Sequence, residues 1–313
     1  MLVRKVFLRS KWMVNDLFGK LRVPLNLEKT HGQIRVICFH GVCSDDRPFI
    51  NGRFMRVSQF ENLLKALVEK TNILNLDDYL NKKVDPNRLN ILLTFDDGYR
   101  NIRVLALPIL QKLNAPSTIF CTSREVLWMD LLDIIAAEKS SLDKVYESFP
   151  VLRNATIQEI KSWGVRQSAV VLLEFTSLLR QMLGSAADNY HEFFELLTDQ
   201  DLLELHTHPL ISIANHGARH ISYTHRTIEE VKEDIEECKK RLILVKASHP
   251  NVFAYPFGHF RKDIQDGLSE TGYPTQFVTE GNPKLSGDLR DRLVVNPFIS
   301  VRNQLICLRN GKY

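Results

Sequence analysis

Residues 90–99 place the strongest constraint on the fold of this chain. They read Asn-Ile-Leu-Leu-Thr-Phe-Asp-Asp-Gly-Tyr. The run from Ile91 to Leu93 lacks polar alternation, which is typical of a strand buried on both faces in a parallel sheet. Asp96 and Asp97 then follow at the strand end, where adjacent carboxylates repel each other and are costly to desolvate. A bound cation removes most of that cost, so the stretch predicts a metal or acid–base site. A solvated Asp-Asp-Gly turn is the alternative.

A second apolar strand ends in two histidines, within residues 211–220, which read Ile-Ser-Ile-Ala-Asn-His-Gly-Ala-Arg-His. On a helical turn, the four-residue spacing of His216 and His220 would place both imidazoles on one face, where they can share a metal ion. Such a pair alone is often simply solvated. Combined with the Asp pair at another strand end, it predicts a metal ion held by one carboxylate and two imidazoles, with open positions for chemistry.

Four ordered motifs resemble those of the polysaccharide deacetylase family, carbohydrate esterase family four with its NodB-homology domain. They are Val36-Ile-Cys-Phe-His-Gly41, Thr94-Phe-Asp-Asp-Gly98, His216-x-x-x-His220 and Phe253-Ala-Tyr-Pro-Phe-Gly258. The resemblance covers roughly residues 33 to 300 and contains a long insertion. It implies a (β/α) barrel with fewer than eight strands and an N-deacetylase activity.

The order of elements fits that fold class. Strands are expected to begin near residues 33, 90, 115, 209, 252, 274 and 293, and helices separate most of them. We therefore predict an α/β protein, a distorted (β/α) barrel of about seven parallel strands with an inserted helical region. Strand–helix alternation alone would also allow an open, doubly wound sheet.

The chain divides into a basic amphipathic segment, residues 1–32, and a barrel, residues 33–313, with a helical insertion at residues 125–205. The insertion has no Gly/Pro-rich linker at either end, so we interpret it as a cap beside the catalytic face. Basic residues interrupt the apolar ones in residues 1–23, so this segment resembles neither a signal peptide nor a membrane span. Its pattern allows a membrane-surface helix, or a helix docked on the barrel.

Composition narrows the partners and the compartment. The net charge is only +4 and Lys and Arg are scattered, so nucleic-acid binding has little support. The cysteines are odd in number and lack Cys-x-x-Cys spacing, which favours buried thiols in a reducing compartment over disulfides. They are Cys38, Cys43, Cys121, Cys238 and Cys307. We therefore expect a cytoplasmic protein, with contact at the inner membrane surface through residues 1–23 as an option.

The resemblance also implies roles for individual residues. Asp96 would be the general base, and Asp97, His216 and His220 would bind a divalent ion, most simply Zn²⁺. Such an ion lowers the pKa of bound water and polarises the acetyl carbonyl of the substrate.

In the fourth motif, Tyr255, Pro256 and Phe257 would shape the substrate groove, and a backbone N–H there could hold the oxyanion. The alternative for Tyr255 is simple packing on Pro256.

Two departures from the family pattern concern catalysis. Many members have an arginine that orients the catalytic Asp, and Ala254 stands at that position here. Many also have a C-terminal Leu-x-His whose His protonates the leaving amine, but no His follows His259. His40 is the best substitute acid, because its strand should neighbour that of Asp97, and His259 is the next candidate.

The predicted function is metal-dependent removal of an N-acetyl group from an amino sugar or glycan, in surface polysaccharide biosynthesis. A sugar nucleotide or a lipid-linked glycan would suit a cytoplasmic or inner-leaflet enzyme. Two alternatives remain: hydrolysis of another amide on the same fold, such as a formamido sugar, and carbohydrate binding without turnover.

Overall fold

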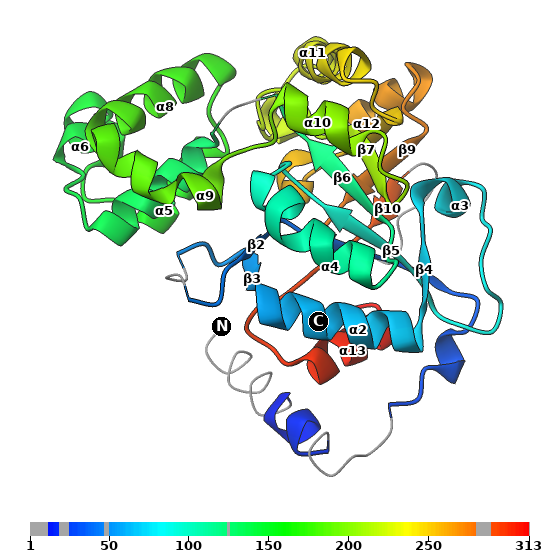
Figure 1. Ribbon diagram of the computed structural model, residues 1–313. Helices are drawn as coiled ribbons and strands as arrows, with labels where there is room; N and C mark the ends of the chain where they lie inside the picture. Colours follow the sequence, from blue (N-terminus) through cyan, green and yellow to red (C-terminus); the bar gives the residue numbers. More distant parts are fainter. Residues whose placement is uncertain (1–11, 19–24, 47–49, 124–125, 280–288, 313) are drawn as a thin grey trace.

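The computed structural model describes residues 12–18, 25–46, 50–123, 126–279 and 289–312 (Figure 1). Nine strands form one all-parallel sheet. In chain order they are β1 (Ile34–Phe39), β4 (Asn72–Leu74), β5 (Asn90–Phe95), β6 (Ser117–Cys121), β7 (Ile211–Asn215), β8 (His249–Ala254), β9 (Thr275–Val278), β10 (Leu289–Asp291) and β11 (Leu293–Val294). The two strands β2 (Gly41–Cys43) and β3 (Phe54–Arg56) pair separately.

The sheet closes almost completely into a barrel. Its strand order is β10-β9-β8-β7-β6-β5-β1-β11, and only Arg292 separates β10 from β11 in the chain. One short segment therefore pairs first with β9 and then with β1, which joins the two edges of the sheet. This confirms the predicted barrel rather than the open sheet. The strand β4 pairs with the first half of β5, beside β6, and adds a short extra strand.

Apolar runs form the strands because both of their faces are covered. Every residue of β5 and β6 is buried. The register of β1 and β5 runs without interruption to the pair Phe39 and Phe95, and the N–H of Asp96 continues the ladder to the carbonyl of Phe39 at 2.9 Å. His40 and Asp96 consequently leave their strands at the same level.

Helices cover the outside of the barrel, and each turns an apolar stripe inward. In α2 the buried residues are Phe60, Leu63, Leu64 and Leu67. The covering helices are α2 (Val57–Lys70), α3 (Leu76–Leu80), the π-helical η2 (Ile102–Ala106) with α4 (Leu107–Lys112), α10 (Asp199–Leu205), α11 (Ile228–Leu244), α12 (Lys262–Glu270) and α13 (Val301–Asn310). The 3-10 turns η1 (Glu28–Thr30), η5 (Tyr223–His225) and η6 (Pro256–Gly258) lie in connections.

A helical lobe stands beside the barrel, between β6 and β7 in the chain (Figure 1). It comprises α5 (Trp128–Glu138), α6 (Asp143–Ser148), η3 (Pro150–Leu152), α7 (Ile157–Gly164), α8 (Ala169–Leu183), η4 (Gly184–Tyr190) and α9 (His191–Phe194). Its core is aromatic, with Phe175 in edge contact with Trp128, Phe149 and Trp163 at ring-centroid distances of 5.3 to 6.3 Å.

The lobe is shorter than the predicted insertion, because α10 lies on the barrel wall (Figure 1). Asp201 of α10 pairs with Arg100 and Arg103, which follow β5. A parallel β6–β7 connection needs a crossover that packs back on the sheet, and α10 supplies the last part of it. All five cysteines are buried and none forms a disulfide. In the described part of the chain, no helix has the length and apolarity to span a membrane.

Candidate active site

The Asp pair follows β5 and the His pair follows β7. The two pairs meet because only β6 lies between these strands and all three strands end at the same end of the barrel. The N–H of His216 continues the ladder to the carbonyl of Cys121 at 3.0 Å. After β5 the chain turns sharply, with Asp97 at φ 70° and Gly98 at φ 77°. A Cβ atom added to Gly98 would lie 3.3 Å from the Cα of Cys121, so this turn requires glycine.

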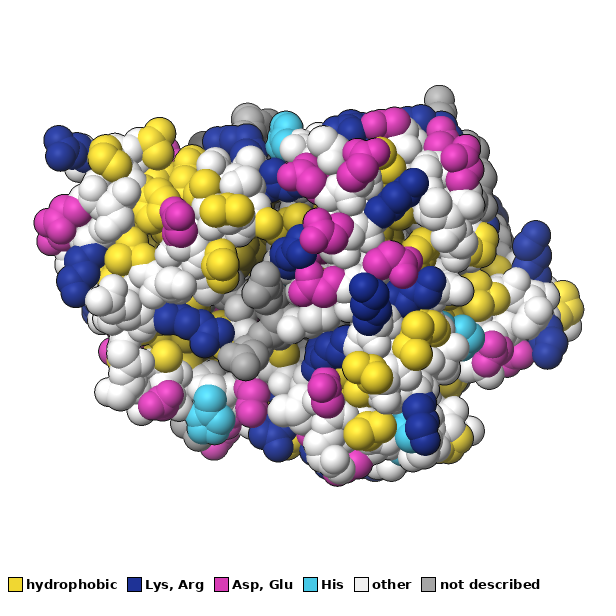
Figure 2. Space-filling model, turned by 90° about the horizontal axis from the view of Figure 1, so that it is seen from above, with side chains coloured by type: hydrophobic (Ala, Val, Ile, Leu, Met, Phe, Trp, Pro, Cys, Tyr) yellow, Lys and Arg dark blue, Asp and Glu magenta, His cyan; other side chains and the backbone are white. Residues whose placement is uncertain are grey.

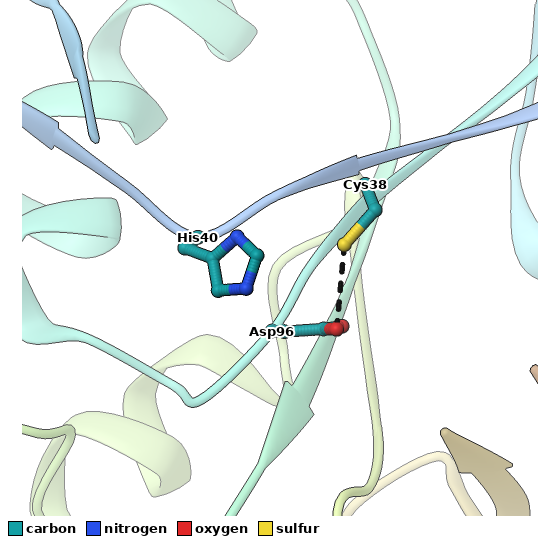
Figure 3. Close-up of side chains that lie close together, drawn as sticks. All are labelled: Cys38, His40 and Asp96. Carbon is teal, nitrogen blue, oxygen red and sulfur yellow. Dashed lines mark hydrogen bonds between the residues drawn. The ribbon is translucent and has the colours of Figure 1, made fainter. Parts of the chain in front are cut away.

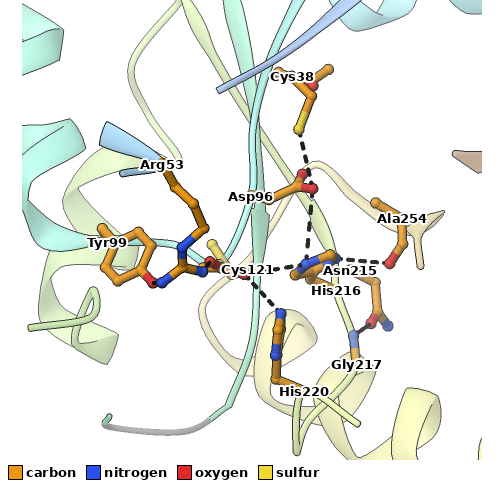
Figure 4. Close-up of polar contacts among 12 residues, drawn as sticks. Cys38, Arg53, Asp96, Tyr99, Cys121, Asn215, His216, Gly217, His220 and Ala254 are labelled. Carbon is orange, nitrogen blue, oxygen red and sulfur yellow. Dashed lines mark hydrogen bonds and ion pairs between the residues drawn. The ribbon is translucent and has the colours of Figure 1, made fainter. Parts of the chain in front are cut away.

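Three ligand-type side chains converge at this end of the barrel. Figure 4 shows two of them, His216 and His220. The Oδ1 of Asp97 lies 3.0 Å from Nε2 of His220 and 3.4 Å from Nε2 of His216. All three residues are buried, and this Oδ1 has no hydrogen-bond partner among the described residues. A carboxylate oxygen and two imidazole nitrogens that face one another in this way fit a shared divalent cation.

Backbone contacts orient the two imidazoles. Nδ1 of His216 donates to the carbonyl of Ala254 at 2.8 Å, which leaves the Nε2 lone pair directed at the Asp97 side. His220 takes φ 48° and its ring lies 4.8 Å from that of Phe257. Positive φ at a residue other than glycine costs energy and is common at functional sites.

A buried carboxylate holds the loop that carries the histidines. Asp234 of α11 accepts hydrogen bonds from the N–H groups of Ala218 and Arg219, at 3.2 and 3.0 Å, and from the hydroxyl of Tyr223 at 2.7 Å. Asp234 is not among the residues predicted from the sequence, although it lies on the helix face of the buried Val231 and Ile235. The sequence signal for Asp234 is a charged residue on an otherwise apolar helix face.

Electrostatics favour a cation in the cluster. Burial acts to raise the pKa of Asp97, but His220 and His216 hold it well below its usual value. Burial acts to lower the pKa of His216, but Asp96 and Asp97 raise it overall. Negative charge therefore dominates around the ring nitrogens, and a bound cation would compensate it.

Arg292 holds the carboxylate of Asp96 with two hydrogen bonds, at 2.6 and 2.7 Å. Burial acts to raise the pKa of Asp96, but Arg292 and nearby groups lower it overall. Arg292 thus makes the contact that the resemblance assigns to an arginine at the position of Ala254. Arg292 was not predicted as a site residue, and its only local signal is a charged residue at the start of the last predicted strand.

His40 lies beside Asp96 and Cys38 (Figure 3), and the ligand-type atoms of these three residues are within 4.8 Å of one another. The thiol of Cys38 donates to Asp96 at 3.3 Å. Arg292 already neutralises this carboxylate, so the group does not need a second cation. Burial lowers the pKa of His40 to about 4, which leaves its imidazole neutral at pH 7.

In the fourth motif, both polar groups of Tyr255 donate hydrogen bonds to neighbouring residues. The N–H of Tyr255 donates to the carbonyl of Phe277 at 2.9 Å, and its hydroxyl donates to Gln276 at 2.5 Å. Tyr255 and Pro256 are buried, and strand pairing uses the N–H of Tyr255, so this particular N–H is not free to hold an oxyanion.

Among the other residues of this motif, Phe257 reaches the metal cluster through its contact with His220. His259 is exposed, and its ring lies 6.3 Å from that of Phe257.

A second charged network joins the cluster to the helical lobe. Arg53, which precedes β3, contacts Asp97, Tyr99 and Asp130 of α5. Burial raises the pKa of Asp130 to about 7, although Arg53 acts to lower it. Neither Arg53 nor Asp130 belongs to one of the four sequence motifs.

Two cavities lie between the lobe and the barrel, where Figure 2 shows a hollow from above. One of 420 Å³ is lined by Trp128 of α5, Leu172 and Leu173 of α8, and Arg219 and Ile221 on either side of His220. The other, of 640 Å³, adjoins α9 and the chain that returns to the barrel. The first cavity therefore adjoins the loop that carries His220.

A parallel (β/α) barrel with an Asp–His–His cluster and a neighbouring, arginine-bound Asp defines a class of barrel hydrolases with a candidate metal centre. A family model described as "Polysaccharide deacetylase" matches residues 83–148 and 181–276, just over half of the chain. The chain belongs to this family, which indicates a deacetylase that acts on an acetylated carbohydrate. The unmatched residues 149–180 lie within the helical lobe.

Solved structures of low sequence identity share the fold. The Streptococcus pyogenes deacetylase PplD, in complex with acetate, is 17% identical, with a TM-score of 0.56 over 88% of this chain and 97% of PplD. IcaB from Ammonifex degensii is 16% identical, with a TM-score of 0.57 over 88% and 96% of the two chains. BC0361, a polysaccharide deacetylase from Bacillus cereus, is 16% identical, with a TM-score of 0.54 over 88% and 68%. No curated protein sequence matches the chain significantly.

Proposed function

We propose that this chain is a metal-dependent hydrolase that removes an N-acetyl group from an amino sugar or glycan in surface polysaccharide biosynthesis. The observation that carries this proposal is the convergence of Asp97, His216 and His220 beside an Asp96 held by Arg292. A divalent ion bound there, most simply Zn²⁺, would polarise the acetyl carbonyl and lower the pKa of a water molecule.

The residues of the chain would move the protons. Asp96 has a lowered pKa, so it is ionised at neutral pH and can accept a proton from the attacking water. The departing nitrogen must gain a proton as the C–N bond breaks. We propose that this proton passes from Asp96 through His40, whose pKa of about 4 makes its protonated form a strong acid toward an amine. Water gives up one proton, and the amine receives it.

Acetate release would test the activity. The protein is incubated with N-acetylated sugar nucleotides and lipid-linked glycans, first with a chelator and then with Zn²⁺ restored. Metal-dependent acetate release is expected. Formate from formamido sugars, without acetate, would favour the deformylase alternative. Sugar binding without release of either acid would favour a carbohydrate-binding relative.

We also propose a cytoplasmic location with peripheral contact at the inner membrane surface. The helical residues 12–18 support the contact, because Asn15 and Asp16 hydrogen-bond Asn303 of α13 while apolar residues stay exposed. These exposed residues are Met13, Val14, Leu17 and Phe18. The segment 1–23 contains six Lys and Arg and one Asp, which suits an anionic lipid surface. Val3, Phe7 and Leu21, which extend the predicted apolar face, lie outside the described residues.

Vesicle binding would test this contact. The wild type should sediment with vesicles that contain anionic lipid, and the double variant L17E/F18E should not. Val151 is similarly exposed on the lobe, so V151E is a control that should bind like the wild type. Equal binding of L17E/F18E and the wild type would contradict the proposal.

A further inference from the structure

The guanidinium of Arg53 lies between two carboxylates, one in the metal cluster and one in the helical lobe. Its Nη1 is 3.2 Å from Oδ2 of Asp97, the oxygen opposite the one that faces the histidines. Its Nη2 donates to Oδ1 of Asp130 and lies 3.0 Å from the hydroxyl of Tyr99. That hydroxyl donates to Oδ2 of Asp130 at 2.9 Å. Figure 4 shows Arg53 and Tyr99 side by side next to the cluster.

Asp130 is fully buried, and its two oxygens accept these hydrogen bonds from Arg53 and Tyr99. Donors on both oxygens suit the ionised carboxylate. Asp130 also comes from α5, so the helical lobe provides the charge that balances Arg53.

The position of Arg53 creates a conflict for any cation in the cluster. A guanidinium on Oδ2 and a metal ion on Oδ1 would draw on the same carboxylate of Asp97 and repel each other. A second negative charge on Arg53 reduces that repulsion. It also divides the planar N–H fork between two carboxylates, so that Asp97 receives a single hydrogen bond from Arg53 instead of two.

We propose that Asp130 is a positioning residue of the metal centre, through which the helical lobe neutralises Arg53 and keeps Asp97 available to the ion. This inference rests on the proposed metal site. It assigns the lobe a role in metal binding in addition to any contact with the glycan. Without Asp130, the positive charge of Arg53 would be balanced by Asp97 alone, and Arg53 would compete with the metal ion for this carboxylate.

Zn²⁺ affinity of the metal-free, full-length chain tests this role, measured by competition with a chromophoric chelator at pH 8, where the carboxyl of Asp130 is ionised. The variant D130N should bind Zn²⁺ about tenfold to a hundredfold more weakly than the wild type, as for other residues that support metal ligands. Asp133, on the same helix, pairs with Lys161, and its charge acts on Arg53 less than the charge of Asp130 does. The control D133N should stay within about twofold of the wild type.

A double variant separates charge balance from packing. R53M/D130N removes both charges, so its Zn²⁺ affinity should return to within about threefold of the wild type. If Asp130 served only to pack the lobe, the double variant would bind Zn²⁺ as weakly as D130N or more weakly. Should D130N alone fail to fold, the double variant still decides by comparison with the wild type: a Zn²⁺ affinity within about threefold supports the charge balance, and weaker binding contradicts it.

The outcomes distinguish this inference from the metal site itself. A wild type that does not bind Zn²⁺ would refute the proposed metal site and this inference with it. A wild type that binds Zn²⁺, with D130N equal to it, would overturn the role of Asp130 and leave the metal site intact. Weak binding by D130N and recovery in R53M/D130N would support the charge balance.

Discussion

Replacing Arg292 by methionine should shift the pH dependence of catalysis toward higher pH. Arg292 is buried, and both oxygens of Asp96 accept hydrogen bonds from its guanidinium at 2.6 and 2.7 Å. The substitution R292M keeps much of the side-chain volume but removes the charge and both donors. Asp96 then remains buried without its main counter-charge.

The magnitude follows from the geometry of the pair. At an effective dielectric constant of about 20, unit charges about 4 Å apart attract by about 4 kcal/mol. That energy corresponds to about 3 pKa units, and an arginine beside an aspartate typically lowers the pKa of the carboxyl by about 1 to 3. Loss of Arg292 should therefore raise the pKa of Asp96 by at least about 1 unit, because only the weaker effects of His216 and His40 then oppose burial.

The sign of the activity change is set by the ionised form. Asp96 must be a carboxylate to accept a proton, and its lowered pKa keeps it ionised far into the acid range. The activity of the wild type should thus be lost only as the pH falls through that low pKa. In R292M the acid limb of kcat/KM should begin at least about 1 pH unit higher.

The pKa of Asp96 also sets how the free energy of unfolding depends on pH. In the wild type, the lowered pKa of Asp96 contributes stability that is present above the unfolded value of 3.8 and is lost as the pH falls through the folded pKa. Breaking a buried pair costs about 3 to 5 kcal/mol at neutral pH. In R292M the pKa of Asp96 is raised, so part of that loss should be recovered as the pH falls toward 4.

The assay is acetate release from the best substrate between about pH 3 and pH 9 with Zn²⁺ present, with unfolding in urea measured in parallel. The variant R292K retains a positive charge without the planar fork, so its acid limb should lie between those of the wild type and R292M. An unchanged acid limb in a folded R292M protein would refute the role of Arg292 in setting the ionisation of Asp96.

Three further predictions concern single side chains. D96N should retain Zn²⁺ and lose about 10²- to 10⁴-fold in kcat, whereas H216A should lose Zn²⁺ affinity; loss of the ion in D96N would reverse the roles within the Asp pair. H40A should lower kcat about 10²-fold with Zn²⁺ affinity unchanged, and an unchanged rate would leave proton delivery to Asp96 or water. L173W would narrow the 420 Å³ cavity, so kcat/KM should fall more for long glycans than for monosaccharides, and an equal change for both would place the glycan elsewhere.

Local patterns in the sequence determine the strands and the four principal site residues. An apolar run without alternation is buried on both faces wherever it lies, and a polar residue directly after it must emerge at the strand end. The strand β5 follows this rule throughout and β7 follows it from Ile213 on, so Asp96, Asp97, His216 and His220 lie at one end of the barrel. The main barrel strands were predictable for the same reason, because each has its own local signal.

The partners of these residues are decided only by the tertiary structure. Arg292 lies 196 residues from Asp96 in the sequence and reaches it because the β10–β11 segment closes the barrel beside β1. Arg53 and Asp130 are 77 residues apart and meet because the lobe folds back against the barrel edge. Helical and strand periodicity report which face of an element is buried. They do not identify the partner of a buried charged side chain, because that partner depends on how distant segments pack.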